Sequence, residues 1–188
     1  MKNLFRTLVV RILQREAAWL LRRQRPTIIA VTGSVGKTTT KDAIYAALRG
    51  QFRVRKSEKS FNSEIGVPLT VLGLPNAWQN PFGWLKNIID GFFVACWSSR
   101  YPAVLVLEVG VDHPGDMAAL TRWLRPDIVV VTRVPDVPVH VEFFSSPEAV
   151  TEEKMSLVSA LQPNGTLIYN ADDMTLVDHL PSVRHKHV

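Results

Sequence analysis

The segment from Thr32 to Thr40, which reads TGSVGKTTT, constrains the fold of this chain more than any other stretch. It follows a short apolar run at 27–32 and precedes a helical pattern at 38–49, which is the context that a phosphate-binding loop requires. Glycines let backbone N–H groups face phosphate oxygens, and a helix N-terminus adds partial positive charge. We therefore predict a nucleotide phosphate site. The alternative is a glycine turn before an ordinary helix.

The predicted phosphate loop assigns a role to each of its residues. Its backbone would surround the phosphates of ATP through Gly33, Ser34, Val35, Gly36 and Thr39. Lys37 would reach the β- and γ-phosphates, and the hydroxyl of Thr38 would bind Mg²⁺. Glu108 ends an apolar run close to where the loop should lie, so its carboxylate can bind the same ion. The alternative is a surface acid at the end of a strand.

Apolar runs alternate with helical patterns along the rest of the chain. Runs that are apolar on both faces are typical of parallel strands covered by helices, so the predicted class is α/β with a parallel sheet flanked by helices. The expected strands are 27–32, 52–55, 103–108, 127–132 and 166–170, and the expected helices are 38–49, 64–74, 84–98, 115–124 and 147–161. Residues 184–188 are predicted to be a frayed tail, whose two histidines offer the alternative of a metal site.

The positive charge of the chain is concentrated at its N-terminus. Residues 1–25 contain seven of the 22 basic residues and one of the 17 acidic residues, which leaves 15 basic and 16 acidic residues elsewhere. A nucleic-acid-binding surface on the body of the protein is therefore not predicted. The single cysteine, Cys96, excludes a disulfide framework.

Residues 1–25 are predicted to form a basic amphipathic helix that precedes an ATP-binding domain at 26–188, because Arg25-Pro26 ends the helical pattern. Its apolar side chains share a broad face, formed by Leu4, Phe5, Leu8, Val9, Ile12, Trp19 and Leu20. A basic helix with Trp and Phe can lie in an anionic membrane interface. The same face can instead pack on this protein or on a missing domain. No run of about 18 apolar residues is present to span a bilayer.

Several segments together resemble the Mur ligases, a family of ATP-dependent enzymes that build the peptidoglycan peptide. The loop has the order Thr-Gly-x-x-Gly-Lys-Thr-Thr instead of the commoner G-x-x-x-x-G-K-[ST]. The other similar blocks are FNSEIGVPLT at 61–70, LEVGVDHPGD at 107–116, RPD at 125–127, NGT at 164–166 and NADD at 170–173. They are most similar to the family members that add D-alanyl-D-alanine. The resemblance covers residues 27–173, most of the family's central ATP-binding domain.

The resemblance implies a second Mg²⁺ in addition to the ion at Thr38 and Glu108. A metal-binding histidine of the family corresponds to His140, although the loop is longer here and Arg133 stands where the family has asparagine. A family lysine that CO₂ converts to an anionic carbamate corresponds to Lys154, which would then be catalytic together with Lys37. The alternatives are a loop histidine without a ligand and an unmodified lysine on a helix surface.

The resemblance also places Asn62 near the nucleotide and substrate channel and Asn170 on the adenine side. It implies that the γ-phosphoryl group of ATP passes to the C-terminal carboxylate of a UDP-MurNAc peptide. The amine of a D-alanyl-D-alanine-type dipeptide then attacks the acyl phosphate, and phosphate leaves. Such an enzyme is cytoplasmic, and the basic helix adds the hypothesis of a place at the inner face of the membrane.

Two parts of such a ligase have no counterpart in the chain, an N-terminal domain that binds the UDP-sugar and a C-terminal domain that closes over ATP. We therefore expect residues 26–188 to be an incomplete central domain, in a fragment or in a half that needs a partner chain, and to bind nucleotide weakly alone. Two alternatives stay open. One is another ligase of the family, such as a folylpolyglutamate-type enzyme, and the other is a non-catalytic ATP-binding module at the membrane.

Overall fold

The structure is a computed structural model that describes residues 2–59, 61–133, 143–179 and 186–187. Its elements follow in the order α1 (Lys2–Gln24), β1 (Thr27–Thr32), α2 (Lys37–Leu48), β2 (Val54–Lys56), α3 (Gly66–Leu72), α4 (Pro81–Trp97), β3 (Val104–Glu108), α5 (Asp116–Thr121), β4 (Ile128–Val131), α6 (Pro147–Ser159), β5 (Thr166–Tyr169), α7 (Met174–His179) and β6 (Lys186–His187). The described strands form one sheet in the order β2-β3-β1-β4-β5-β6, and all neighbours are parallel. The predicted α/β class is confirmed.

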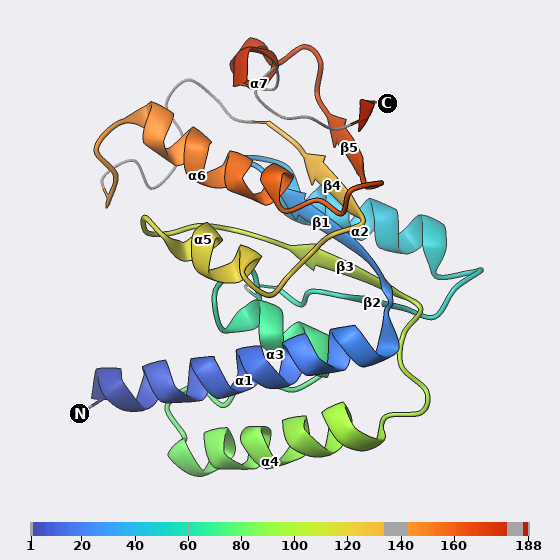
Figure 1. Ribbon diagram of the computed structural model, residues 1–188, viewed down its shortest axis with the longest axis vertical. Coiled ribbons are helices and arrows are strands. Elements are labelled where there is room, and N and C mark those ends of the chain that lie inside the picture. The colour runs from blue at the N-terminus through green and yellow to red at the C-terminus, as the bar shows by residue number, and fades with distance from the viewer. Residues whose placement is uncertain (1, 60, 134–142, 180–185, 188) are drawn as a thin grey trace.

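The two faces of the sheet bury alternate residues of its strands, because successive side chains of a strand point to opposite sides. One face packs under α2, where Ile44 and Leu48 meet Ile29, Val31, Val104, Val106 and Val130. The other face, which includes Ala30, Leu105 and Leu107, joins the larger core with side chains of α1, α3, α5 and α6. Figure 1 shows α1 and α3 between the sheet and α4, so α4 forms an outermost layer.

Helix α1 belongs to the core of the domain. Val9, Leu13, Ala17, Leu20 and Leu21 are buried in the main cluster, where α1 packs on α3 and α4. Packing on this protein is therefore shown for these residues of α1, and membrane contact by the helix stays a prediction. The helix ends where Arg25 adopts a left-handed conformation (φ 47°) before Pro26.

The apolar face predicted for α1 is wrong in part. Of its seven residues, Val9 and Leu20 are buried, whereas Phe5, Leu8 and Trp19 are 46–56% exposed. The reason is that α1 carries two apolar stripes, and the periodicity of the sequence does not tell which of them the domain covers.

Helix α4 has a capped start and a mixed surface. The side chain of Asn80 accepts hydrogen bonds from the N–H groups of Phe82 and Gly83, so the helix begins at Pro81, earlier than predicted. Its inner side buries Trp84, Asn87, Gly91 and Ala95 at helical spacing. In the described part of the chain, no helix combines the length and the apolar character needed to cross a bilayer.

The C-terminal region contains two elements that were not predicted. Helix α7 follows β5, and β6 adds two residues, Lys186 and His187, to the sheet beside β5. The prediction of a frayed tail is therefore wrong for these two residues. A strand of two residues has no periodicity to detect, and it forms here because β5 offers a free edge whose backbone groups need partners.

Candidate functional site

The loop after β1 has the backbone geometry that its glycines allow. Gly33 and Gly36 have φ values of 135° and 86°, a region that L side chains rarely adopt. A Cβ atom on Gly33 would overlap the hydroxyl of Thr132, which follows β4. That hydroxyl donates to the carbonyl of Val35 at 2.7 Å, and the N–H of Ser34 donates to the carbonyl of Arg133 at 2.7 Å. The Gly33–Gly36 loop is therefore fixed against the carboxyl end of β4.

The N-terminus of α2 opens directly from this loop. Gly36 occupies the N-cap position and provides no side-chain acceptor for the first turn. The leading N–H groups of an α-helix have no acceptor within the helix, and the helix dipole makes this end partially positive. The first turn, which begins with Lys37, Thr38 and Thr39, therefore offers donors to an anion at the loop.

Two lysines from different helices meet at Ser34. The Nζ of Lys37 donates to the carbonyls of Gly33 at 2.9 Å and Ser34 at 3.3 Å, and the Nζ of Lys154 on α6 donates to the Ser34 hydroxyl at 3.1 Å. Burial lowers the pKa of Lys37, and the charges of Glu108 and Asp112 oppose this shift. Burial and the charge of Lys37 lower the pKa of Lys154 to about 8. Two partly desolvated cations beside the N-terminus of α2 have the charge and the donors to bind an anion.

Lys154 is not on the surface of its helix. Only 2% of the residue is exposed. The alternative that placed Lys154 on the helix surface is therefore wrong. Its neighbour Glu153 contacts α5 and not the loop, because its carboxylate accepts hydrogen bonds from the N–H groups of Gly115 and Met117 at the start of that helix.

Glu108 faces the loop from the end of β3. The hydroxyl of Thr38 donates to its two carboxylate oxygens at 3.2 and 3.0 Å, and the Nζ of Lys41 lies 3.2 Å from Oε2. Glu108 and Lys41 are both buried, at 6% and 2% exposure. The backbone N–H of Glu108 donates to the Ser57 hydroxyl, which ties the end of β3 to the segment after β2.

The pair of Thr38 and Glu108 fits a magnesium ion that also binds phosphate. Magnesium prefers hard oxygen ligands and is commonly held by one or two carboxylates together with substrate phosphates. The hydroxyl and the carboxylate face each other at the mouth of the loop, and the ammonium of Lys41 already places a positive charge against the carboxylate. No three His, Cys, Asp or Glu side chains gather as a metal-binding group among the described residues. His140 lies outside the described residues.

The two predicted asparagines lie at the same edge of the sheet. The carbonyl of Asn62 accepts the N–H of Gly110, just beyond β3, at 2.8 Å. Asn170, just beyond β5, helps to line a cavity of about 370 Å³ together with Thr40, Thr132 and Arg133. Carboxyl ends of parallel strands are where α/β sheets bind ligands.

Lys41 is a site residue that the sequence analysis missed. A signal was present, because Lys37 and Lys41 are four residues apart and share one face of α2. Among the predicted residues, the structure brings Lys37 and Lys154 to the Gly33–Gly36 loop, and it pairs Thr38 with Glu108.

Comparison with known proteins gives a consistent result. Residues 31–81 and 97–188 match the protein family described as the Mur ligase middle domain. The UDP-N-acetylmuramoyl-tripeptide–D-alanyl-D-alanine ligase of Bacillus subtilis (strain 168) is 34% identical over 164 residues, covering 87% of this chain and 30% of that protein. The ligase of the same name from Borreliella burgdorferi is 31% identical over 150 residues, covering 80% and 27%.

Solved structures agree with the sequence comparison. The MurF ligase from Thermotoga maritima in complex with ADP superposes with a TM-score of 0.72 and 27% identity, covering 95% of this chain and 36% of that chain. The chain thus spans 27–36% of the length of these three relatives.

Proposed function

This chain belongs to the Mur ligase family, whose middle domain it contains, and from this premise we propose that it provides the ATP-binding part of a peptide-bond-forming ligase. Two relatives are named UDP-N-acetylmuramoyl-tripeptide–D-alanyl-D-alanine ligases. We infer the same kind of substrates here, a UDP-MurNAc peptide and a D-alanyl-D-alanine-type dipeptide. The observation that carries the proposal is the convergence of Lys37, Lys154, Thr38 and Glu108 on one glycine loop.

In the proposed reaction, the chain holds the phosphates of ATP and neutralises their charge. The first N–H groups of α2 and the ammonium of Lys37 bind phosphate oxygens. The γ-phosphoryl group passes to the carboxylate of the UDP-MurNAc peptide, giving an acyl phosphate and ADP. The dipeptide amine attacks the acyl carbon, the C–N bond forms, phosphate leaves with the electron pair of the broken C–O bond, and the nitrogen loses one proton to water. Positioning and charge stabilisation are the contributions required from the protein.

We propose the following roles in binding magnesium, the adenine and the substrates. Thr38 and Glu108 would hold a magnesium ion, which when bound neutralises charge on the β- and γ-phosphates. His140 and a carbamylated Lys154 would hold a second ion. The burial and lowered pKa of Lys154 support the carbamate, because only the uncharged amine attacks CO₂. Asn170 would contact the adenine from the cavity beside Thr40, and Asn62 would face the substrate channel.

Calorimetric titration with Mg-ADP tests the nucleotide assignment. We expect weak but saturable binding by the 188-residue chain. In Lys37→Ala it should be roughly 10- to 100-fold weaker, since a charge-assisted contact to phosphate is lost. Lys59→Ala, which removes an exposed lysine outside the loop, is the matched control and should bind as the wild type does. Equal affinities of Lys37→Ala and wild type would refute the phosphate loop.

A further inference from the structure

Two helices of the structure lie outside the part of the chain that matches the Mur ligase middle domain. The match begins at residue 31, after α1, and it omits residues 82–96, which form most of α4. The two helices pack against each other at the foot of the molecule in Figure 1. The two helices thus lie largely outside the segments matched by the family model, and the proposed ligase chemistry does not account for their outer surface.

The outer surface of this pair, which we call the aromatic face, is formed mainly by α4. Its exposed side chains on α4 are 47–80% accessible, and they are Phe82, Leu85, Ile89, Phe92, Phe93 and Trp97. On α1, Trp19 continues the surface, with its ring centre 6.3 Å from that of Phe92. The rings of Phe93 and Trp97 are 5.4 Å apart. A contiguous apolar surface of this kind marks an interaction site in soluble proteins.

The orientation of α4 is fixed by its contacts with α1. The Arg23 guanidinium donates to the carbonyl of Ala95 at 2.6 Å, and the side-chain amide of Gln24 donates to the carbonyl of Ser98 at 2.6 Å. Gly91 faces Glu16 so closely that a Cβ atom would overlap the carboxylate. Because these contacts lie on the inner side of α4, its aromatic residues stay on the outside.

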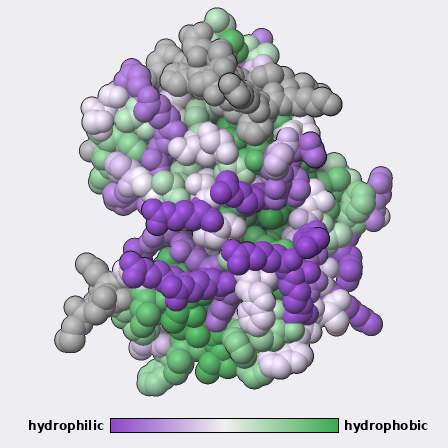
Figure 2. Space-filling model, in the orientation of Figure 1, coloured by the Kyte–Doolittle hydropathy of each residue, from purple (hydrophilic) through white to green (hydrophobic). Residues whose placement is uncertain are grey.

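A row of arginines on α1 borders the aromatic face. Arg11, Arg15 and Arg22 are exposed. At about 100° per residue they follow Leu8 and Trp19 around the helix. None of the ion pairs in the described part of the chain involves them. Figure 2 shows purple side chains in a band over α1, directly above the green side chains over α4. The result is an apolar surface with a cationic border.

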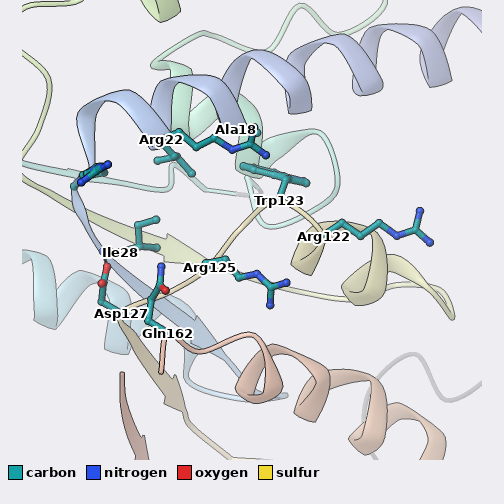
Figure 3. Close-up of a pocket in the computed structure, with 11 residues that line it drawn as sticks. Ala18, Arg22, Ile28, Arg122, Trp123, Arg125, Asp127 and Gln162 are labelled. Carbon is teal, nitrogen blue, oxygen red and sulfur yellow. Dashed lines mark hydrogen bonds between the residues drawn. The ribbon is translucent and has the colours of Figure 1, made fainter. Parts of the chain in front are cut away.

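The arginine row leads into a pocket of about 690 Å³ between the end of α1 and the segment 122–127. Four arginines line this pocket, namely Arg22, Arg25, Arg122 and Arg125. Figure 3 shows the three labelled arginines extending in one direction, away from Asp127, whose carboxylate accepts a hydrogen bond from the backbone of β1. Guanidinium groups are donors that bind a phosphate group.

We propose that the aromatic face and the arginine row form a peripheral binding surface for an anionic phospholipid bilayer. Phe and Leu side chains suit the acyl boundary, Trp suits the headgroup level, and arginines beside them attract anionic lipids. The pocket would take a lipid phosphate. A second copy of this chain fits less well, because a symmetric interface would bring two rows of unpaired arginines together.

Vesicle flotation of the 188-residue chain tests the proposal. The vesicles contain phosphatidylcholine alone or an equimolar mixture of phosphatidylcholine and phosphatidylglycerol. We expect flotation with the anionic mixture and little with phosphatidylcholine. Phe93→Glu and Arg15→Glu should each weaken partitioning roughly 10-fold. Phe52→Glu and Arg49→Glu alter exposed residues beside α2 and are the matched controls, which should float as the wild type does. Circular dichroism melting identifies any variant that is unfolded.

Other outcomes would overturn the proposal. Absence of flotation by the folded wild type, or equal flotation of Phe93→Glu, would remove the lipid surface. A dimer in light scattering that Phe93→Glu dissociates, without vesicle binding, would assign the face to a second copy. Binding of inorganic pyrophosphate that Arg125→Glu abolishes, again without flotation, would assign the pocket to a free phosphate compound.

Discussion

At the scale of single residues, the buried pair of Lys41 and Glu108 makes the clearest prediction. Removing one partner of a buried ion pair leaves an uncompensated charge and costs about 3–5 kcal/mol. We expect Lys41→Met to lower the free energy of unfolding by this amount, because Glu108 is almost inaccessible to water. Urea denaturation measures the change. The double variant Lys41→Met/Glu108→Gln should recover most of the loss, and a double variant no more stable than Lys41→Met would contradict this account.

Lys154 is a second residue whose environment predicts a measurable property. Its pKa of about 8 makes its uncharged amine far more abundant near neutral pH than that of an ordinary lysine with a pKa of 10.5. At a constant pressure of ¹³C-labelled CO₂, we expect a carbamate carbon signal in the NMR spectrum that grows as pH rises through about 8. Lys154→Arg should lack the signal. A signal of equal strength in that variant would show that another amine reacts.

At the scale of elements, the sequence predicts most strands and helices because the sheet is buried on both faces. The run at 104–107 is apolar throughout and ends at the acidic Glu108, so it stands out against the helical patterns. The buried face of α1 could not be predicted in the same way. Leu13 and Trp19 are both apolar, and only the packing of the folded domain buries Leu13 and leaves Trp19 exposed. Lys41 was missed for a related reason, because its spacing from Lys37 places it on the same face of α2 but does not show that its side chain is buried.

A buried carboxylate, that of Glu16, lies between α1 and α4, and its titration should change the free energy of unfolding of the protein. Burial raises the pKa of Glu16 from 4.5 to about 7, and its Oε2 has no hydrogen-bond partner among the described residues. The folded protein therefore holds this proton more tightly than the unfolded chain. Its stabilising effect is complete below pH 4.5 and is lost as pH rises through about 7.

The variant Glu16→Gln tests whether the titration of Glu16 changes the stability of the protein. The variant keeps the shape of the side chain and cannot ionise, so we expect it to be more stable than the wild type at pH 8, by at most about 3 kcal/mol. The advantage should vanish at low pH. Thermal melting at several pH values measures it, with the exposed Glu58→Gln as the control. A constant difference between Glu16→Gln and wild type at all pH values would exclude titration of Glu16 as the cause.

At the scale of the whole molecule, the two proposed functional surfaces of the chain are built in different ways. The candidate nucleotide site uses the carboxyl ends of β1, β3 and β4, which lie in the part that matches the family. The aromatic face uses α1 and α4, and Figure 1 shows the α1 and α3 layer between α4 and the sheet. A described link between the two regions is Glu64, which pairs with Arg6 of α1 at 2.9 Å and lies two residues from Asn62.

This arrangement predicts that the two surfaces act independently. The Arg6–Glu64 pair is largely exposed on the arginine side, and such pairs contribute at most about 1 kcal/mol, too little to transmit a strong signal. Mg-ADP should therefore leave vesicle flotation unchanged, Lys37→Ala should float as the wild type does, and Phe93→Glu should bind Mg-ADP normally. If Mg-ADP instead changed the floated fraction, repeating the assay with Arg6→Ala would decide whether this contact carries the coupling. Loss of the effect in that variant would mean that the Arg6–Glu64 contact couples nucleotide binding to lipid binding through α1.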